Sequence, residues 1–216
     1  MIDVIIRNEV KSDFREVEIL TRKAFWNVNV PGCDEHYLAH ILRKHKDFIP
    51  ELDFVAETKE GKIVGNVMYT KAKLVDESGE EMPILTFGPI SVHPDYQRMG
   101  ISKRLLEHSF EKAVQLGYRL IVIFGNPDNY VSRGFKSCKR YNICVADGSH
   151  PTAMLVKELV EGTVVSGKKW FYHESPAYVI ESADAEKFDE QFEPMKKEFR
   201  PSQEEFYIHS HSIIRN

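Results

Sequence analysis

The chain has 216 residues, a length that suits one ordinary domain with an appendage or a two-domain protein with a small second part. Hydrophobic residues make up 42% of the chain and charged residues 29%, which is the balance of a globular protein rather than of a disordered or membrane-embedded one. The formal net charge of -4 leaves no basic excess to neutralise a nucleic-acid backbone, so we expect no nucleic-acid partner and only a local phosphate site.

Cysteine usage and the start of the chain bear on the compartment. Cys33, Cys138 and Cys144 are odd in number and match no zinc-ligand spacing, so we expect buried thiols, a reducing compartment and no metal site. The first four residues contain an acid and no cationic run, which argues against a signal peptide. No apolar run approaches the ~20 residues of a membrane span. We therefore predict a cytoplasmic protein with no membrane partner.

Hydrophobic periodicity predicts strands and helices in mixed order along the first half of the chain. A β-branched run at 4–7 predicts a strand, and Lys11-Ser12-Asp13 then precedes a helix with apolar residues at helical spacing up to Phe25. We expect a second helix over 34–45 after the Pro31-Gly32 break. The remaining expected elements are antiparallel strands over 52–58 and 63–73 around a turn at 59–62, and a third strand from about 84 to 92.

The second half continues in the same mixed order. Apolar residues on one face predict a helix from Ile101 that Gly117 closes. The further expected elements are a buried strand over 120–124, a short helical segment between Asn126-Pro127 and Gly134-Phe135, strands over 141–145 and 154–160, and a polar helix over 183–192. These elements predict an α/β fold with a mixed central sheet flanked by helices.

The segment from Gly88 to Lys103 carries the chemistry. Proline cannot donate to a strand ladder and glycine weakens it, so Gly88-Pro89 marks a bulge that can splay two strands apart. The strand leads through a tight loop into a helix start, where backbone N–H groups without intrahelical partners bind anions. Gly100 lets the backbone approach a bulky phosphate, and Arg98, Lys103 and Arg104 can add charge-assisted contacts. The spacing therefore predicts a pyrophosphate site.

The loop resembles that of a known enzyme family. Gln97-Arg98-Met99-Gly100-Ile101-Ser102 resembles the phosphate-loop pattern Q/R-x-x-G-x-G/A of the GNAT superfamily of N-acetyltransferases, with Ser102 departing from the last position. The dinucleotide and ATP-binding glycine patterns are absent from the sequence, which leaves coenzyme A as the ligand that this loop best fits. The Gly88-Pro89 bulge and a later Tyr130 four residues ahead of Gly134-Phe135 arrive in the family's order. Within the superfamily, the sequence of this segment most resembles that of small bacterial acetyltransferases whose substrate is unassigned.

The resemblance implies which residues hold acetyl-CoA. Backbone groups of Ile90 and Val92 are expected along the pantetheine arm, and Asn126 is a candidate contact to a pantetheine amide. Tyr130 matches the family's proton donor to the departing thiolate, since a phenol with a pKa near ~10 can hydrogen-bond a thiolate whose free pKa is about 8.5. The loop and helix start are expected to bind the pyrophosphate through Arg98, Met99, Gly100, Ile101, Ser102 and Lys103.

Each of these assignments has an ordinary structural alternative. Tyr130 can simply pack its ring in the core, and Asn126 can form an Asx turn ahead of Pro127. The general base stays unassigned, because neither His93 nor Glu57 lies in a motif that identifies it. Cys138 and Cys144 would be nucleophiles only beside a histidine, and none lies near them in the sequence.

The sequence thus predicts an N-acetyltransferase that moves an acetyl group from acetyl-CoA to a primary amine of a small molecule or peptide by direct attack. Two alternatives stay open. One is an acyl-CoA-binding sensor with little or no turnover, and the other is a binding or assembly module whose C-terminal segment after Pro151, with its aromatic cluster at 170–172, mediates contacts. We expect a GNAT-like domain over 1–160 and a C-terminal extension over 161–216 packed on it, and a homodimer stays open. The acceptor pocket is expected from 25–36 and the C-terminal region, with a helix from about Ala183 that covers the acceptor side or a partner subunit.

Overall fold

The computed structural model describes residues 2–165 and 167–215 of the chain. The chain divides into two compact units. Strands β3 (Ile63–Asp76) and β4 (Glu81–Val92) and helix α3 (Ile101–Gln115) each contribute residues to both units. The first unit comprises Met1–Tyr69, Gly88–Lys112 and Pro176–Gln203, and the second comprises Thr70–Phe87, Ala113–Ser175 and Glu204–Asn216.

Strands and helices follow one another in mixed order along the chain. The strands are β1 (Val4–Asn8), β2 (Phe54–Thr58), β3, β4, β5 (Leu120–Phe124), β6 (Lys136–Ser137), β7 (Ile143–Cys144), β8 (Met154–Glu158) and β9 (Trp170–His173). The α-helices are α1 (Phe14–Phe25), α2 (Glu35–Leu42), α3, α4 (Pro127–Tyr130), α5 (Ser182–Asp189) and α6 (Pro201–His211). Single 3-10 turns lie at Lys11–Asp13, Pro50–Leu52, Pro94–Tyr96, Val131–Arg133, Cys138–Tyr141 and Pro176–Tyr178.

The first unit is built on a meander of strands with helices packed on it. β1 pairs antiparallel with β2. β2 pairs antiparallel with the first part of β3, as the sequence predicts. Helix α1 buries Val17 and Leu20 against Val55 and Ile63, because apolar residues three and four apart fall on one helix face. Full burial of such a side chain stabilises the fold by roughly 1.5–3 kcal/mol. The amphipathic pattern thus fixes how α1 lies on the strands.

The start of α1 differs from a simple side-chain cap. The Asp13 carboxylate accepts the Val10 backbone N–H at 2.9 Å and pairs with Arg7 at 2.6 Å. The guanidinium of Arg7 is the main cause that holds the pKa of Asp13 below its usual value. Asp13 therefore closes the 3-10 turn that leads into α1, and it ties this turn to β1.

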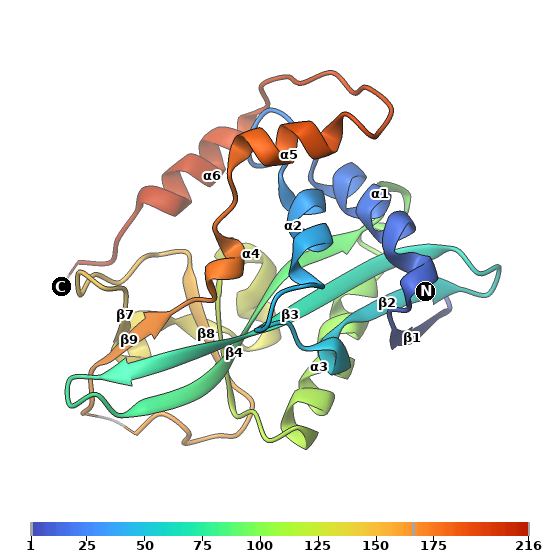
Figure 1. The fold of residues 1–216 in the computed structure, drawn as a ribbon. Coiled ribbons are helices and arrows are strands. Elements are labelled where there is room, and N and C mark those ends of the chain that lie inside the picture. The colour runs from blue at the N-terminus through green and yellow to red at the C-terminus, as the bar shows by residue number, and fades with distance from the viewer. Residues whose placement is uncertain (1, 166, 216) are drawn as a thin grey trace. The chain divides into compact units, whose positions relative to one another are not determined.

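Part of the C-terminal region belongs to the first unit. Helix α5 lies beside α1 and α2 (Figure 1). Its Phe188 ring packs 4.6 Å from the His40 ring between centroids. Arg22 Nε donates to Asp189 Oδ1 at 2.6 Å, with the arginine side chain almost fully buried. Phe192, just beyond the helix, packs edge-on against Phe188. The predicted helix over 183–192 thus forms, ends at Asp189, and has the packing partner that its two phenylalanines require.

The second unit holds further sheet pairings. β5 pairs in parallel with β4 through Leu85 and Ile121 and antiparallel with β8, and β8 also pairs with β6. β9 pairs antiparallel with the far part of β3 and in parallel with β7. The sheet is therefore mixed, as predicted. Its core contains Leu74, Ile84, Leu120, Val122, Met154, Val156 and Trp170.

Some elements differ from the sequence-based expectation. The strand expected over 141–145 is shorter, because Cys138–Tyr141 forms a 3-10 turn and only Ile143–Cys144 pairs with a neighbour. The aromatic segment at 170–172 lies in strand β9, with Trp170 and Tyr172 buried. Within the described residues, no helix has the length and apolar character needed to cross a membrane.

Candidate functional site

The loop after β4 is held at both of its ends. The His93 backbone N–H donates to the Val64 carbonyl at 3.0 Å, and the His93 ring Nδ1 accepts the Asp95 N–H at 3.3 Å at the start of the turn Pro94–Tyr96. The Gln97 amide donates to the Val92 carbonyl at 3.3 Å. His93 is therefore a turn residue.

The loop then turns through two left-handed residues into α3. Arg98 has φ 61° and Gly100 has φ 85°. The Arg104 N–H donates to the Gly100 carbonyl at 3.1 Å and closes the first turn of α3. None of the described residues accepts a hydrogen bond from the backbone N–H of Met99, Gly100 or Ile101, and none would lie within 4 Å of a Cβ atom at Gly100. The loop thus presents N–H donors beside open space, which is the form of an anion cradle.

Helix α3 is anchored by close packing beneath its first turn. Ile101 is only 1% exposed and Leu105 is fully buried. A Cβ atom at Gly65 on β3 would lie 2.9 Å from Ile101 Cγ2 and 3.3 Å from the Ser91 carbonyl oxygen, so only glycine leaves room for the helix there. The side chain of Ile101 therefore belongs to the core, and its backbone belongs to the cradle.

The cations near the cradle have different roles. Arg98 is exposed and pairs with no acid among the described residues. Lys103 lies 3.6 Å from Glu107 one turn along α3, and both side chains are more than half exposed. Arg104 donates to the Val4 carbonyl at 2.6 Å, so its guanidinium fastens α3 to β1. The exposed side chains of Arg98 and Lys103 can therefore contact an anion bound in the cradle.

Strand β4 brings Ile90 and Val92 into the same unit as the loop. Both residues are partly buried near the end of the strand. The Gly88–Pro89 peptide bond is cis, and the Tyr178 hydroxyl donates to the Gly88 carbonyl at 3.2 Å. Tyr178, 90 residues away in sequence, was not found by sequence reasoning because no local pattern connects it to β4.

Tyr130 lies in the second unit at the end of α4. Its ring packs against Phe87 and Phe135, with centroids 5.8 Å and 5.6 Å away. A Cβ atom at Gly125 would lie 2.5 Å from the Tyr130 ring, so the glycine leaves space for the ring. Burial raises the pKa of the hydroxyl to about 12, and no described residue shares a hydrogen bond with it. The ring is a packing element and the hydroxyl stays a protonated donor at neutral pH.

Asn126 adopts the ordinary role that the sequence leaves open. Its Oδ1 accepts the Asp128 backbone N–H at 3.0 Å and caps α4, with Pro127 at the first helical position. This bond leaves the Nδ2 donors of Asn126 for other partners. Gly134, with φ 86°, ends the following 3-10 turn before Phe135.

The match to known proteins agrees with this geometry. Residues 6–138, which are well over half of the chain, match the family described as acetyltransferase (GNAT) domain. The chain belongs to this GNAT acetyltransferase family. The matched range contains the cradle at 97–102 and Tyr130.

Individual relatives lead to the same family. The chain is 26% identical over 140 residues to an uncharacterized N-acetyltransferase of Escherichia coli, YhbS, covering 65% of this chain and 78% of the relative. It is 30% identical over 128 residues to a second one, YjhQ, covering 59% and 65%.

Two solved structures share the fold. The crystal structure of E. coli YhbS in complex with CoA has a TM-score of 0.70 at 21% identity, over 82% of this chain and 93% of that one. The structure of a GNAT acetyltransferase from Brucella melitensis in complex with acetyl-CoA has a TM-score of 0.63 at 22% identity, over 83% and 100%.

An acetyltransferase that acts on amines needs a group to take a proton from the acceptor. Glu57 accepts a hydrogen bond from Arg7 Nε at 2.5 Å, and Arg7 also binds Asp13. His93 already uses Nδ1 in its turn, and burial lowers its pKa. Neither residue stands out as the base, and its identity stays open.

The cysteine thiols are buried, as predicted. One of them has a histidine neighbour that sequence reasoning missed: Cys33 Sγ lies 3.5 Å from His36 Nδ1, and His36 Nε2 lies 3.0 Å from Asp189 Oδ1. The order resembles a nucleophile, a base and an acid. However, burial raises the pKa of Cys33 and lowers that of His36 to about 4, and Asp189 is already paired with Arg22. The thiol and imidazole therefore stay neutral, and the cluster has the character of packing.

Proposed function

We propose that this GNAT acetyltransferase transfers an acetyl group from acetyl-CoA to a primary amine of a small molecule or peptide, by direct attack of the amine on the thioester. The observation that carries the proposal is the cradle at the start of α3, inside the matched range of the family. Acetyl-CoA supplies the activated acetyl group. The chain's own residues bind its phosphates, orient it and hold a proton for the departing thiol.

The cradle fits a pyrophosphate on its own geometry. The N–H groups of Met99, Gly100 and Ile101 have no acceptor among the described residues, and the open space at Gly100 is where a ligand can come close to the backbone. Arg98 and Lys103 add positive charge beside a helix start that already attracts anions. The CoA-bound relatives of the same fold support this assignment.

Tyr130 is proposed as the proton donor to the thiolate of CoA. A phenol whose pKa is about 12 holds its proton throughout the neutral range, and a departing thiolate then meets a neutral donor. Direct transfer is also supported by the cysteines, because Cys33, Cys138 and Cys144 are buried and burial raises the pKa of each thiol. Asn126 Nδ2 is the proposed contact to a pantetheine amide.

One observation favours a second candidate, an acyl-CoA-binding sensor with little turnover. Both of the candidate bases have other partners, Glu57 with Arg7 and His93 within its turn. A protein that keeps the cradle without a base would bind acetyl-CoA and acylate slowly or not at all.

The experiment that separates the two is a measurement of free thiol released from acetyl-CoA by the full chain. The acceptor panel contains amino acids, polyamines, aminoglycosides and lysine peptides, with buffer alone as the blank. Thiol release above the blank, together with an acetylated amine found by mass spectrometry, supports the enzyme. Tight binding of acetyl-CoA with no release above the blank for any amine supports the sensor.

A further inference from the structure

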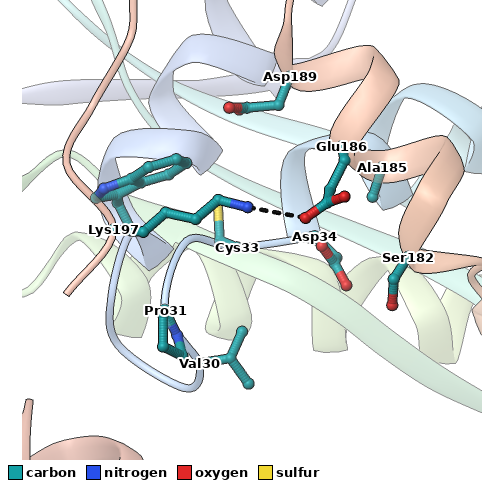
Figure 2. A pocket seen from close by; sticks show the side chains of 10 residues that line it. Val30, Pro31, Cys33, Asp34, Ser182, Ala185, Glu186, Asp189 and Lys197 are labelled. Carbon is teal, nitrogen blue, oxygen red and sulfur yellow. Dashed lines mark hydrogen bonds and ion pairs between the residues drawn. The ribbon is translucent and has the colours of Figure 1, made fainter. Parts of the chain in front are cut away.

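A pocket of about 240 Å³ lies in the first unit, outside the cradle. Its walls come from the connection between α1 and α2, from α5 and from the segment that follows α5 (Figure 2). Trp26, Pro31, Asp34, Glu186 and Asp189 are among the residues that line it. All of these residues belong to the same compact unit as the cradle.

The charges around the pocket do not balance. Three carboxylates line it, those of Asp34, Glu186 and Asp189. Two cations face them: Lys197 Nζ lies 3.1 Å from Glu186, and Arg22 binds Asp189 through two nitrogens at 2.6 Å and 3.1 Å. The pocket therefore has one more negative charge than it has positive charges.

Asp34 is the carboxylate left over. No described residue donates a hydrogen bond to its side chain, and Figure 2 shows it on the wall of the pocket near Glu186. Burial is the main cause that raises its pKa, and the neighbouring acids raise it further while Lys197 lowers it. The imidazole of His36, which lies beside Asp189, stays neutral because burial lowers its pKa to about 4. A cationic ligand would give the Asp34 carboxylate the hydrogen-bond donor and positive partner that it lacks among the described residues.

One of the protein's own primary ammonium groups, that of Lys197, lies at this pocket. Trp26 Nε1 and Asn27 Nδ2 both donate to the Lys196 carbonyl, at 3.0 Å and 2.9 Å, and the Glu198 N–H donates to Asn27 Oδ1 at 3.2 Å. These bonds hold the backbone on both sides of Lys197. Its side chain then extends across the pocket to Glu186, as Figure 2 shows.

The path of this side chain depends on a glycine. A Cβ atom at Gly32 would lie 3.0 Å from Lys197 Cε, so the absence of a side chain leaves room for the four-carbon stem. The Lys197 side chain is 49% exposed and that of Glu186 is 67% exposed, and exposed ion pairs of this kind add little stability. Lys197 is therefore seated in the pocket and readily displaced from it.

We propose that this pocket binds the ammonium group of a primary alkylamine, with Lys197 as an internal occupant that the ligand displaces. The inference rests on the proposed function in one respect: it makes alkylamines with an unbranched cationic chain, such as polyamines and lysine side chains, the acceptor class. Binding itself requires no acetyl transfer. Occupancy by Lys197 lowers the apparent affinity by the fraction of time that the pocket is filled.

The test is an NMR titration of the full-length protein with n-butylammonium chloride, which copies the end of the Lys197 side chain, and with 1-pentanol as an uncharged probe. Lys197→Met keeps an unbranched chain against Gly32 and removes the charge. Lys196→Met is the matched control, because this neighbour carries the same charge on a side chain that is 85% exposed and pairs only with Glu198 among the described residues. We expect Lys197→Met to bind n-butylammonium about two- to sixfold more tightly than the parent, because an exposed ion pair keeps the Lys197 side chain in place for roughly half to four-fifths of the time.

The control and 1-pentanol should show no gain, and Asp34→Asn added to Lys197→Met should lose the gain. Equal affinity in the Lys197→Met and Lys196→Met proteins, or an equal gain for 1-pentanol, overturns the proposal. Tighter n-butylammonium binding without any thiol release from acetyl-CoA would support the proposed ammonium pocket and contradict the proposed acetyl transfer. Acetylation of alkylamines with a KM that Lys197→Met leaves unchanged would support acetyl transfer and contradict the proposed pocket.

Discussion

Replacement of Gly100 by valine tests the cradle where ligand and backbone come closest. A side chain at this position would project into space that no described residue fills. The left-handed backbone, with φ 85°, adds strain of about 1–2 kcal/mol for a residue with a Cβ atom. The substitution should therefore cost some stability and should also push an anion away from the N–H groups.

The size of the binding effect follows from the hydrogen bonds lost. Each charge-assisted bond contributes roughly 1.5–3 kcal/mol, and about 1.4 kcal/mol corresponds to tenfold in affinity. Loss of one such bond predicts acetyl-CoA binding weaker by roughly tenfold to a hundredfold. Calorimetric titration of the folded Gly100→Val protein measures this change directly.

Gly117 offers a matched control just beyond the end of α3. It has φ 89°, and no described residue would lie within 4 Å of its Cβ atom. Gly117→Val should therefore lose a similar amount of stability in chemical denaturation and keep its affinity for acetyl-CoA. Unchanged affinity in folded Gly100→Val, or an equal loss in Gly117→Val, would refute the assignment of the cradle.

Three further predictions concern other parts of the chain. Tyr130→Phe should lower kcat by ~10²-fold or more, with acetyl-CoA affinity within a few-fold of the parent, because only the proton is removed. Tyr141→Phe is the control, since Tyr141 is a partly buried tyrosine outside the motif. An undiminished kcat in the Tyr130→Phe protein would make Tyr130 a packing residue. A chain ending at Ser182 should melt at a lower temperature than the full chain, because it lacks the Arg22–Asp189 pair, and an unchanged melting temperature and activity would contradict this. Burial is the main cause that raises the pKa of Asp53 in the folded state, and Glu9 raises it further. The folded protein therefore keeps a proton that the unfolded chain releases, so the free energy of unfolding should fall as pH rises from about 4. Urea denaturation at several pH values should show a smaller fall for Asp53→Asn, and parallel curves for the two proteins would exclude the effect.

The sequence predicted the parts of the fold that local patterns determine. Helix α1 follows from its apolar spacing, the β2–β3 hairpin from its turn, and the cradle from a glycine before a helix start. Gly134 ends the turn before Phe135 because glycine adopts the left-handed conformation without strain. Each of these features is decided by residues within about ten positions of one another.

Contacts between distant residues could not be predicted in the same way. The pairing of Arg22 with Asp189 spans 167 positions, and that of Asn27 with Lys196 spans 169. The contact between Cys33 and His36 could be predicted from the sequence, because residues three apart at the start of a helix lie close together.

The family match and the alkylammonium pocket cover different parts of the chain. The match ends at residue 138, after the cradle and Tyr130. Two walls of the pocket, Glu186 and Lys197, lie well beyond that point, whereas Asp34 lies within the matched range. If acetyl transfer depends on the matched range and acceptor choice on the later segment, substitutions at 182–197 should change KM for amines and leave acetyl-CoA affinity alone. Substitutions in the cradle should do the reverse, so the two sets of variants separate cofactor binding from acceptor recognition.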